Sequence, residues 1–309
     1  VCYLSFDKKI WIDEFTSHFK TDIFFTVKYD YWYNLLEKLK ADGAKVFVVS
    51  ALFYETQIFF KAYGNWFVEQ LSKNVDWFFH QTKHSTALAK SIGLSNSSTA
   101  GDTRFDRVKK LRERDNFVEY IDEFKQNKKT IVFGSSWESE ERLAEIVASK
   151  NRDLKMIIAP HDLKRVANLK EIFPNAMLYS QLTNSQVFNS SNSQVLIIDC
   201  IGLLSKLYSY GDLAVVGGGF HSKGLHNILE AATFGIPVLF GDHYQKNPEA
   251  DELIAQHGGK CFEDEFFAAP YILSLLNDEE LLKKMSLNAR NFIDSQPNAS
   301  ELILNKMLS

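Results

Sequence analysis

Short apolar runs that resemble β-strands alternate with stretches that resemble helices over nearly the whole chain. Strands that alternate with helices are typical of parallel sheets covered on both faces, so the pattern predicts an α/β fold. Helices are expected at 33–41 and 82–92, and others are expected to begin near Glu138, Asp162, Leu203, Asn227 and Glu249. The expected strands lie at 23–26, 46–50, 77–80, 97–100, 130–134, 155–159, 176–179, 195–198, 213–216 and 238–240.

A charged stretch at 107–129 has little apolar surface and divides the alternation into two series. With 309 residues the chain is long enough for two domains, which we expect at 1–124 and 125–309. Each domain is expected to be Rossmann-like, and ligands of such domains bind beyond the carboxyl ends of the strands. The chain opens without Met inside an apparent strand, VCYLSF, so we expect the first domain to be incomplete.

Charge and cysteine content narrow the class of protein further. The formal net charge of −4 argues against a general nucleic-acid binder, so no nucleic-acid partner is expected. The three cysteines are far apart and form no CxxC pair, which argues against a zinc site or a disulfide framework. No metal-ligand cluster is apparent, and we expect neither a metal nor a cofactor. No run of 18 apolar residues occurs, so no membrane-spanning helix is expected.

The glycine-rich stretch at 215–241 offers the strongest candidate site, and it reads VVGGGFHSKGLHNILEAATFGIPVLFG. Gly218 and Gly219 allow the backbone to turn sharply and to approach a ligand closely. Asn227 would begin a helix whose free N–H groups can bind a phosphate, and Glu230 could accept hydrogen bonds from ribose hydroxyls. The alternative is a capping box, with Asn227 as the cap and Glu230 as its partner.

Three further loops follow predicted strands of the second domain. Ser135 and Ser136 can cap a helix or bind an anion at its N-terminus; the alternative is an ordinary helix start with acidic first-turn residues. His161, after Pro160, can donate to a phosphate or a base, although a single histidine is more often a surface or capping residue. At Gly202–Leu204 backbone N–H groups can bind a nucleotide, but a strand–glycine–helix connection is also generic.

Three segments carry a resemblance to a known family: VKYDYWYN at 27–34, AGDTRFDRV at 100–108 and the glycine-rich GGGFHSKGLHNILEAATFGIPVLFG at 217–241. They resemble the 3-deoxy-D-manno-octulosonic acid (Kdo) transferases of lipid A biosynthesis. The resemblance implies a GT-B fold, in which two Rossmann-like domains face each other. It also implies a glycosyltransferase that moves Kdo from CMP-Kdo to a lipid A precursor. The implied setting is lipopolysaccharide biosynthesis at the cytoplasmic face of the inner membrane of Gram-negative bacteria.

The resemblance also implies which residues bind the donor and which act in the reaction. Asp30 and Arg104 fall on the two positions that stabilise charge in the transition state. The family usually has Glu at the position of Asp30 and often has Lys at the position of Arg104. Arg suits an anionic sugar acid because its planar fork binds carboxylate or phosphate through two hydrogen bonds. Leu203 stands where the family usually has Glu, and Trp137 where it usually has His. The implied CMP contacts are Pro160, His161, Gly202, Leu203, Leu204, Asn227, Ile228, Leu229 and Glu230.

Two further family features have no counterpart in this sequence. The family's general base is a Glu in a Gly-Glu loop near the start of the first domain, and a membrane anchor precedes it. A positioned base should matter because the acceptor hydroxyl loses a proton as it attacks. We therefore expect the chain to be a fragment that binds the donor but transfers Kdo poorly.

An aromatic-rich stretch at 51–67, ALFYETQIFFKAYGNWF, has two interpretations. The first is a helix that faces the core. The second is a face that meets the bilayer or the acyl chains of a lipid acceptor, because Trp, Tyr and Lys suit an interface. Exposure discriminates between them, since burial of Phe59, Phe60, Trp66 and Phe67 together would exclude the membrane.

Two alternative functions remain open from the sequence. One is a nucleotide-sugar epimerase of the same fold, which would need a UDP site rather than a CMP site. The other is a non-catalytic donor-binding module. Thermal shift with CMP against UDP would separate the transferase from the epimerase.

Overall fold

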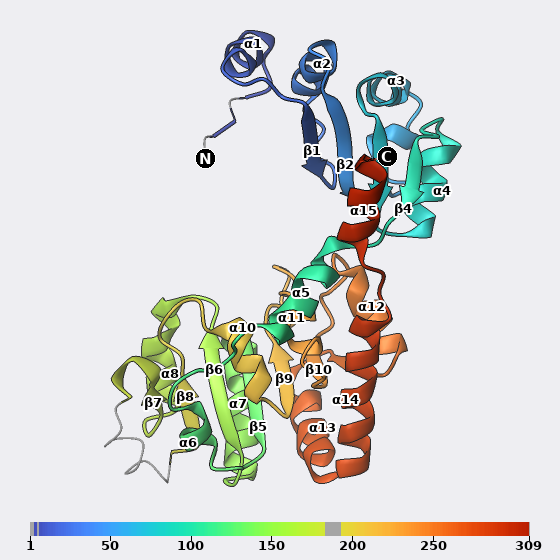
Figure 1. Ribbon diagram of the computed structural model, residues 1–309. Coiled ribbons are helices and arrows are strands. Elements are labelled where there is room, and N and C mark those ends of the chain that lie inside the picture. The colour runs from blue at the N-terminus through green and yellow to red at the C-terminus, as the bar shows by residue number, and fades with distance from the viewer. Residues whose placement is uncertain (1–2, 5, 183–192, 309) are drawn as a thin grey trace. The chain divides into compact units, whose positions relative to one another are not determined.

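The computed structural model describes residues 3–4, 6–182 and 193–308. They form two compact units, each built on its own parallel sheet (Figure 1). The first unit comprises 1–106 and 296–309, and the second comprises 107–295. The division therefore falls earlier than the expected boundary at 124/125, and the end of the chain returns to the first unit. No helix in the described part of the chain is both long enough and apolar enough to span a bilayer.

The first unit is a four-stranded parallel sheet with strand order β1-β2-β3-β4. Its strands are β1 (Ile23–Val27), β2 (Lys45–Ala51), β3 (Trp77–His80) and β4 (Ser97–Thr99). Its helices are α1 (Lys9–Ser17), α2 (Tyr33–Ala41), the 3₁₀ turn η1 (Ile58–Phe60), α3 (Asn65–Asn74), α4 (Lys83–Ser91), the start of α5 (Thr103–Glu113) and α15 (Ala299–Leu308). The expected strands and the helices α2 and α4 are therefore present within a few residues of their predicted bounds.

The core of the first unit forms where α2 packs on the sheet. Leu35, Leu36 and Leu39 lie on one face of α2 and are at most 4% exposed. They pack with Val46 and Val48 of β2, which are fully buried. The apolar spacing in α2 is that of a helix with one buried face, which explains why the helix forms here.

The aromatic stretch is not one core helix. Phe53 is 1% exposed and belongs to the core, whereas Phe59 and Phe60 are half-buried at its edge in η1. Trp66 and Phe67 lie in the first turn of α3, where they are 48% and 39% exposed. Of the two interpretations, the one as a core-facing helix is therefore wrong. The exposure that a membrane-facing surface requires is met by Trp66 and Phe67.

The C-terminal helix α15 is fixed to the first unit by a cap and by apolar packing. The Asp106 carboxylate accepts hydrogen bonds from the backbone N–H groups of Ala299 (3.1 Å) and Ser300 (2.6 Å). Ile303 packs with Phe47 and Phe79 of the sheet. A capping carboxylate and a buried apolar contact are each worth about 1 kcal/mol or more, so they explain why this helix joins the first unit.

The second unit is a seven-stranded parallel sheet with strand order β11-β10-β9-β5-β6-β8-β7. Its strands are β5 (Thr130–Ser136), β6 (Lys155–Pro160), β7 (Met177–Leu178), β8 (Val195–Ile197), β9 (Leu213–Val216), β10 (Val238–Gly241) and β11 (Gly259–Phe262). All of the expected strands are present, and β11 is an additional edge strand that the sequence pattern did not predict.

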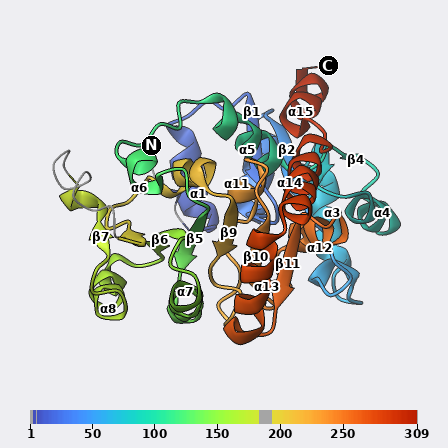
Figure 2. The same ribbon diagram turned by 90° about the horizontal axis from the view of Figure 1, so that it is seen from below.

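Helices cover the sheet of the second unit, and Figure 2 shows α7, α8 and α13 along one side of it. Its helical segments are α6 (Ile121–Lys125), α7 (Glu138–Lys150), η2 (Leu163–Arg165), α8 (Val166–Ile172), η3 (Tyr179–Gln181), α10 (Leu204–Leu207), η4 (Tyr208–Tyr210), α11 (Leu229–Ala232), α12 (Pro248–Ala255), α13 (Glu265–Asn277) and α14 (Glu279–Asp294). Leu143, Ala144 and Val147 of α7 pack with α13 and with Ile131 and Phe133 of β5 to form the core.

Candidate functional site

The candidate site lies at the carboxyl ends of β5, β6, β8 and β9. The strand order of the second unit reverses at β5, because β6 follows on one side and β9 lies on the other. In open parallel sheets the crevice at such a reversal is where ligands bind. The Gly217 N–H donates to the Gly134 carbonyl oxygen at 2.9 Å, which joins the two loops at this point.

The glycines at 217–219 are required because the chain approaches itself closely. A Cβ on Gly219 would lie 2.7 Å from the backbone N and O of Gly241, and a Cβ on Gly217 would overlap the Ser135 carbonyl. Gly218 has a φ of +91° and packs against Gly224. The close approach predicted for Gly218 and Gly219 is thus an approach to neighbouring backbone, which explains these glycines without a ligand.

Glu140 joins the first and last loops of the site. It is fully buried in α7, and its carboxylate accepts hydrogen bonds from the backbone N–H groups of Trp137 (2.9 Å) and Gly218 (3.0 Å). Burial raises the pKa of Glu140 to about 7. From the sequence, Glu140 is indistinguishable from an ordinary first-turn acid of a helix. The one sign in the sequence is its spacing, since an acid three residues after the N-cap residue can accept from that residue's backbone N–H.

A buried ion pair fixes the β6 loop. The Glu141 carboxylate is fully buried and accepts two hydrogen bonds from Arg165, at 2.8 Å from Nε and 2.7 Å from Nη2. Ser136 Oγ lies 3.4 Å from the same carboxylate, and the Ser136 carbonyl accepts from the His161 N–H at 3.0 Å. Buried Ser136 therefore links the loop after β5 to the loop after β6. The helix cap predicted for the serines is not formed, because Trp137 is the N-cap residue of α7.

Two of the predicted donor segments line one pocket. Pro160 and His161 line it from the end of β6, and Gly202 and Leu204 line it from the loop after β8. The pocket has a volume of about 550 Å³, within the range of about 300–1,000 Å³ that small-molecule sites occupy. The strand register places these segments together although they are far apart in the sequence.

Asn227 and Glu230 do not form the capping box that was the alternative interpretation of this segment. Ile228 is the N-cap of α11, and the Asn227 amide donates to the Glu230 carboxylate at 3.2 Å, side chain to side chain. The Asn227 Oδ1 accepts from the Leu229 N–H at 3.1 Å, so this first-turn donor is already occupied. The side chains of Ile228 and Leu229 are fully buried, which leaves Asn227 and Glu230 as the side chains at the surface.

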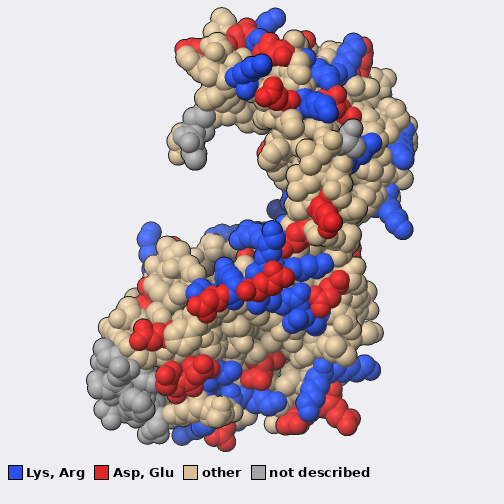
Figure 3. All heavy atoms as spheres, viewed as in Figure 1, with Lys and Arg blue, Asp and Glu red and all other residues tan. Residues whose placement is uncertain are grey.

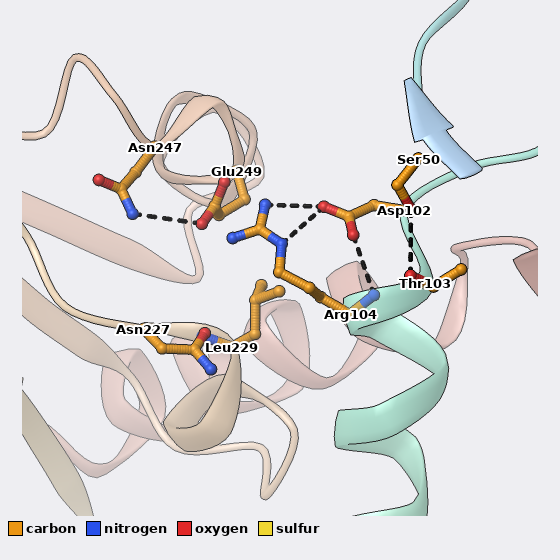
Figure 4. Close-up of polar contacts among 8 residues, drawn as sticks. All are labelled: Ser50, Asp102, Thr103, Arg104, Asn227, Leu229, Asn247 and Glu249. Atoms are coloured by element: carbon orange, nitrogen blue, oxygen red, sulfur yellow. Dashed lines mark hydrogen bonds and ion pairs between the residues drawn. The ribbon is translucent and has the colours of Figure 1, made fainter. Parts of the chain in front are cut away.

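The two predicted charge-stabilising residues belong to the first unit. Asp30 follows β1 and is exposed, and Arg104 lies in the first turn of α5, after β4. The guanidinium of Arg104 donates to Asp102 through Nε (2.8 Å) and Nη2 (2.7 Å), as Figure 4 shows. Strands β1 and β4 are at opposite edges of the sheet, about 14 Å apart at the usual strand spacing. Asp30 and Arg104 therefore follow strands at opposite edges of this sheet.

Charged side chains of both signs are interspersed over the face of each unit that Figure 3 shows.

Groups of three or more His, Cys, Asp or Glu that could hold a metal ion do not occur among the residues that the structure describes.

The two parallel sheets with helices on their faces define the GT-B class, and solved structures of that class match the chain. The UDP-GlcNAc 2-epimerase from Neisseria meningitidis matches with a TM-score of 0.65 and 17% identity, over 97% of this chain and 79% of that one. The C-terminal CMP-Kdo binding domain of WaaA from Acinetobacter baumannii matches with a TM-score of 0.50 and 21% identity, over 61% of this chain and 97% of that one. The predicted fold class is confirmed.

Within this class the sequence is similar to the Kdo transferases, in line with the resemblance noted from its motifs. Residues 1–107 match the family described as 3-deoxy-D-manno-octulosonic-acid transferase. The transferase of that name from Chlamydophila psittaci is 27% identical over 81% of this chain and 59% of its own length. The one from Rickettsia typhi is 24% identical over 94% of this chain and 61% of its own length. The chain therefore spans about three fifths of the length of these relatives.

Proposed function

We propose that the chain acts in a Kdo transferase, with the second unit binding the donor and the first unit on the acceptor side. The reaction proposed is the transfer of Kdo from CMP-Kdo to a lipid A precursor, in lipopolysaccharide biosynthesis, without a metal or other cofactor. The place proposed is the cytoplasmic face of the inner membrane of a Gram-negative bacterium. The observation that carries the proposal is the pocket shared by Pro160, His161, Gly202 and Leu204, which are four of the residues assigned to CMP by the resemblance.

The pocket and the neighbouring α11 suggest how CMP would lie. The His161 ring and the apolar lining around Pro160 suit the cytosine ring. The Glu230 carboxylate, with 18% of its side chain exposed, is oriented by Asn227 and could accept hydrogen bonds from the ribose hydroxyls. In the first unit, Arg104 is paired with Asp102 and keeps the positive charge that the resemblance implies at its position. Asp30 keeps the negative charge that the family has at its position.

The exposed aromatic side chains of the first unit support an acceptor held at a membrane. Trp66 and Phe67 project from α3, and Tyr63 before it is 72% exposed. Amphipathic aromatic rings are favoured where water meets lipid. We propose this surface for contact with the lipid acceptor or the bilayer around it.

Donor binding tests the proposed function directly. CMP at 100 times its Kd should stabilise the second unit by about 2.7 kcal/mol, because a ligand of the folded state shifts unfolding by mass action. Glu230→Ala should weaken CMP binding about tenfold and leave the fold intact. The matched control is Glu145→Ala, an exposed glutamate on α7. Unchanged CMP affinity with a less stable unit would show that Glu230 is only structural.

One observation favours the epimerase as a second candidate, since solved UDP-GlcNAc 2-epimerases match nearly the whole chain in fold. The same thermal-shift experiment decides between the two. Stabilisation by CMP but not by UDP supports the transferase. Stabilisation by UDP alone would overturn the proposal in favour of the epimerase.

A further inference from the structure

An aromatic cluster surrounds Trp137 at the point where the strand order reverses. The His161 ring stacks on the indole with centroids 4.4 Å apart, and the His221 ring meets it edge-on at 4.9 Å. The His226 ring lies 4.6 Å from His161. The Lys223 Nζ lies 4.1 Å from the centroid of the indole ring. We call Trp137, His161, His221, Lys223 and His226 the Trp137 cluster.

Hydrogen bonds fix the protons of two of these imidazoles. The Trp137 indole can only donate, and its Nε1–H donates to His226 Nε2 at 3.3 Å, so the neutral His226 ring carries its proton on Nδ1. His221 Nδ1 accepts from the Lys223 backbone N–H at 3.2 Å, so the neutral His221 ring carries its proton on Nε2. Both assignments leave each ring with one N–H to donate.

The His221 N–H is a buried donor that lacks a partner. His221 Nε2 is inaccessible and has no hydrogen-bond partner among the residues that the structure describes. A buried donor left unpaired costs about 1–3 kcal/mol, so native structures rarely keep one without a reason. A ligand with an acceptor oxygen, bound against the cluster, would satisfy this donor.

The charges around the cluster favour an anionic ligand. Lys223 supplies a cation against the indole, and His243 lies close enough to His221 to act on its charge. Of the surrounding carboxyl groups, Glu140 accepts from two backbone N–H groups. Asp242 Oδ1 lies 3.1 Å from His243 Nδ1 and has no hydrogen-bond partner among the described residues. Asp162, next to His161, caps the turn that follows it. Glu138, in the first turn of α7, is exposed.

We propose that the Trp137 cluster is a binding subsite for an oxyanion, either a phosphate or a carboxylate. The imidazole N–H groups would donate to its oxygens and Lys223 would balance its charge. The proposal rests on the proposed function in placing the donor in these loops, and it adds which groups hold the donor's anion. CMP-Kdo carries both a phosphodiester and a carboxylate, so either group could occupy the subsite.

Anion binding at this subsite should be coupled to uptake of protons. Burial, together with Lys223 for His221 and with His161 for His226, lowers the pKa of both imidazoles below 6.5, so without a ligand they are mostly neutral at pH 7. A bound anion favours the imidazolium form and raises these pKa values. Deprotonation of Glu140 near pH 7 adds a negative charge beside the subsite. Both effects strengthen anion binding as the pH falls.

Sulfate is a suitable probe because its charge does not change between pH 5.8 and 7.8. The measurement is an NMR titration of the whole chain with ¹³C-labelled histidine, following the imidazole signals. We expect sulfate to shift the signals of His221 and His226 and to bind about tenfold more tightly at pH 5.8, since one pKa unit gained on binding corresponds to tenfold. Equal affinity at the two pH values would overturn the proposal.

Three variants separate donation from packing. His221→Phe removes the donor and should reduce sulfate affinity at least about fivefold. His221→Gln keeps an N–H donor but cannot titrate, so it should bind sulfate with weaker pH dependence. His84→Phe is the control, since His84 is exposed in the first unit. Near-ultraviolet circular dichroism checks folding. Unchanged sulfate binding in folded His221→Phe contradicts the proposal.

CMP and free Kdo distinguish the two sources of the anion, each measured with wild type and His221→Phe at one pH. If only CMP binding weakens in the variant, the subsite holds the phosphate. If only Kdo binding weakens, it holds the carboxylate. CMP and Kdo that bind wild type and variant equally would overturn the subsite and leave the proposed function standing. Sulfate that behaves as expected, with no CMP binding at all, would leave the subsite and overturn the donor assignment.

Discussion

At the scale of single residues, the site depends on buried carboxylates that the sequence pattern treats as ordinary helix-start acids. Glu140 and Glu141 are both fully buried, yet an acidic first turn is usually solvated. Glu140 accepts from two backbone N–H groups, and Glu141 is paired with Arg165. Burial without such partners would cost several kcal/mol, so the partners explain how these acids can lie inside.

Glu140 should make stability depend on pH. Its pKa in the folded protein, about 7, lies above the ordinary value of 4.5. The contribution of protonated Glu140 to the free energy of unfolding is therefore fully present below pH 4.5 and is lost as the pH rises through 7. Glu140→Gln should remove this dependence, which amounts to about 2–3 kcal/mol between those limits. Urea unfolding from pH 4.5 to 8 measures it, with exposed Glu145→Gln as the control. Parallel pH profiles for wild type and Glu140→Gln would contradict the assignment.

At the scale of elements, the alternation of apolar runs predicted every strand except β11. That strand reads GKCF, and it lies at the edge of the sheet with Lys260 exposed, so it lacks the apolar run that marks the others. Helix α1 was also not predicted. The aromatic stretch was assigned one helix because its spacing suits one. Gly64 and the packing of Phe53 in the core divide it instead into η1 and α3.

The glycine loop after β9 should tolerate no side chain at Gly219. Gly219→Ala would place a Cβ 2.7 Å from the Gly241 backbone, and the backbone would have to move. We expect a loss of about 1–3 kcal/mol in the free energy of unfolding, as for other overpacked sites. Ser222→Ala, at an exposed position of the same loop, is the control. Denaturant unfolding compares the two, and equal stability would show that this close approach is not required.

At the scale of the whole molecule, each unit has its own core, but the first unit is built from two separate segments of the chain. The polar stretch at 107–129 was expected to divide the chain, and the first segment of the first unit ends at Asp106, just before this stretch. The return of α15 could not be predicted, because its attachment rests on Asp106 and on Phe47 and Phe79, which are distant in sequence.

This attachment predicts which unit a change in α15 affects. Ile303→Ala should lower the stability of the first unit by about 2–4 kcal/mol, the usual cost of a buried large-to-small substitution, and leave CMP binding by the second unit unchanged. Leu304→Ala is the matched control, since Leu304 is 55% exposed on the same helix. Hydrogen exchange resolves the two units. A loss of protection confined to the second unit would show that α15 belongs there instead.

The sequence by itself determined the two series of strands and helices, the family resemblance and the loops that carry the donor-binding candidates. These depend on periodicity and on motifs formed by residues that are close together in the sequence. The tertiary structure alone decided that Pro160 and Gly202 share a pocket, that Glu140 joins the Trp137 and Gly218 loops, and that three histidines surround one indole. Those contacts follow from the order of strands in a parallel sheet, which places the ends of distant strands side by side.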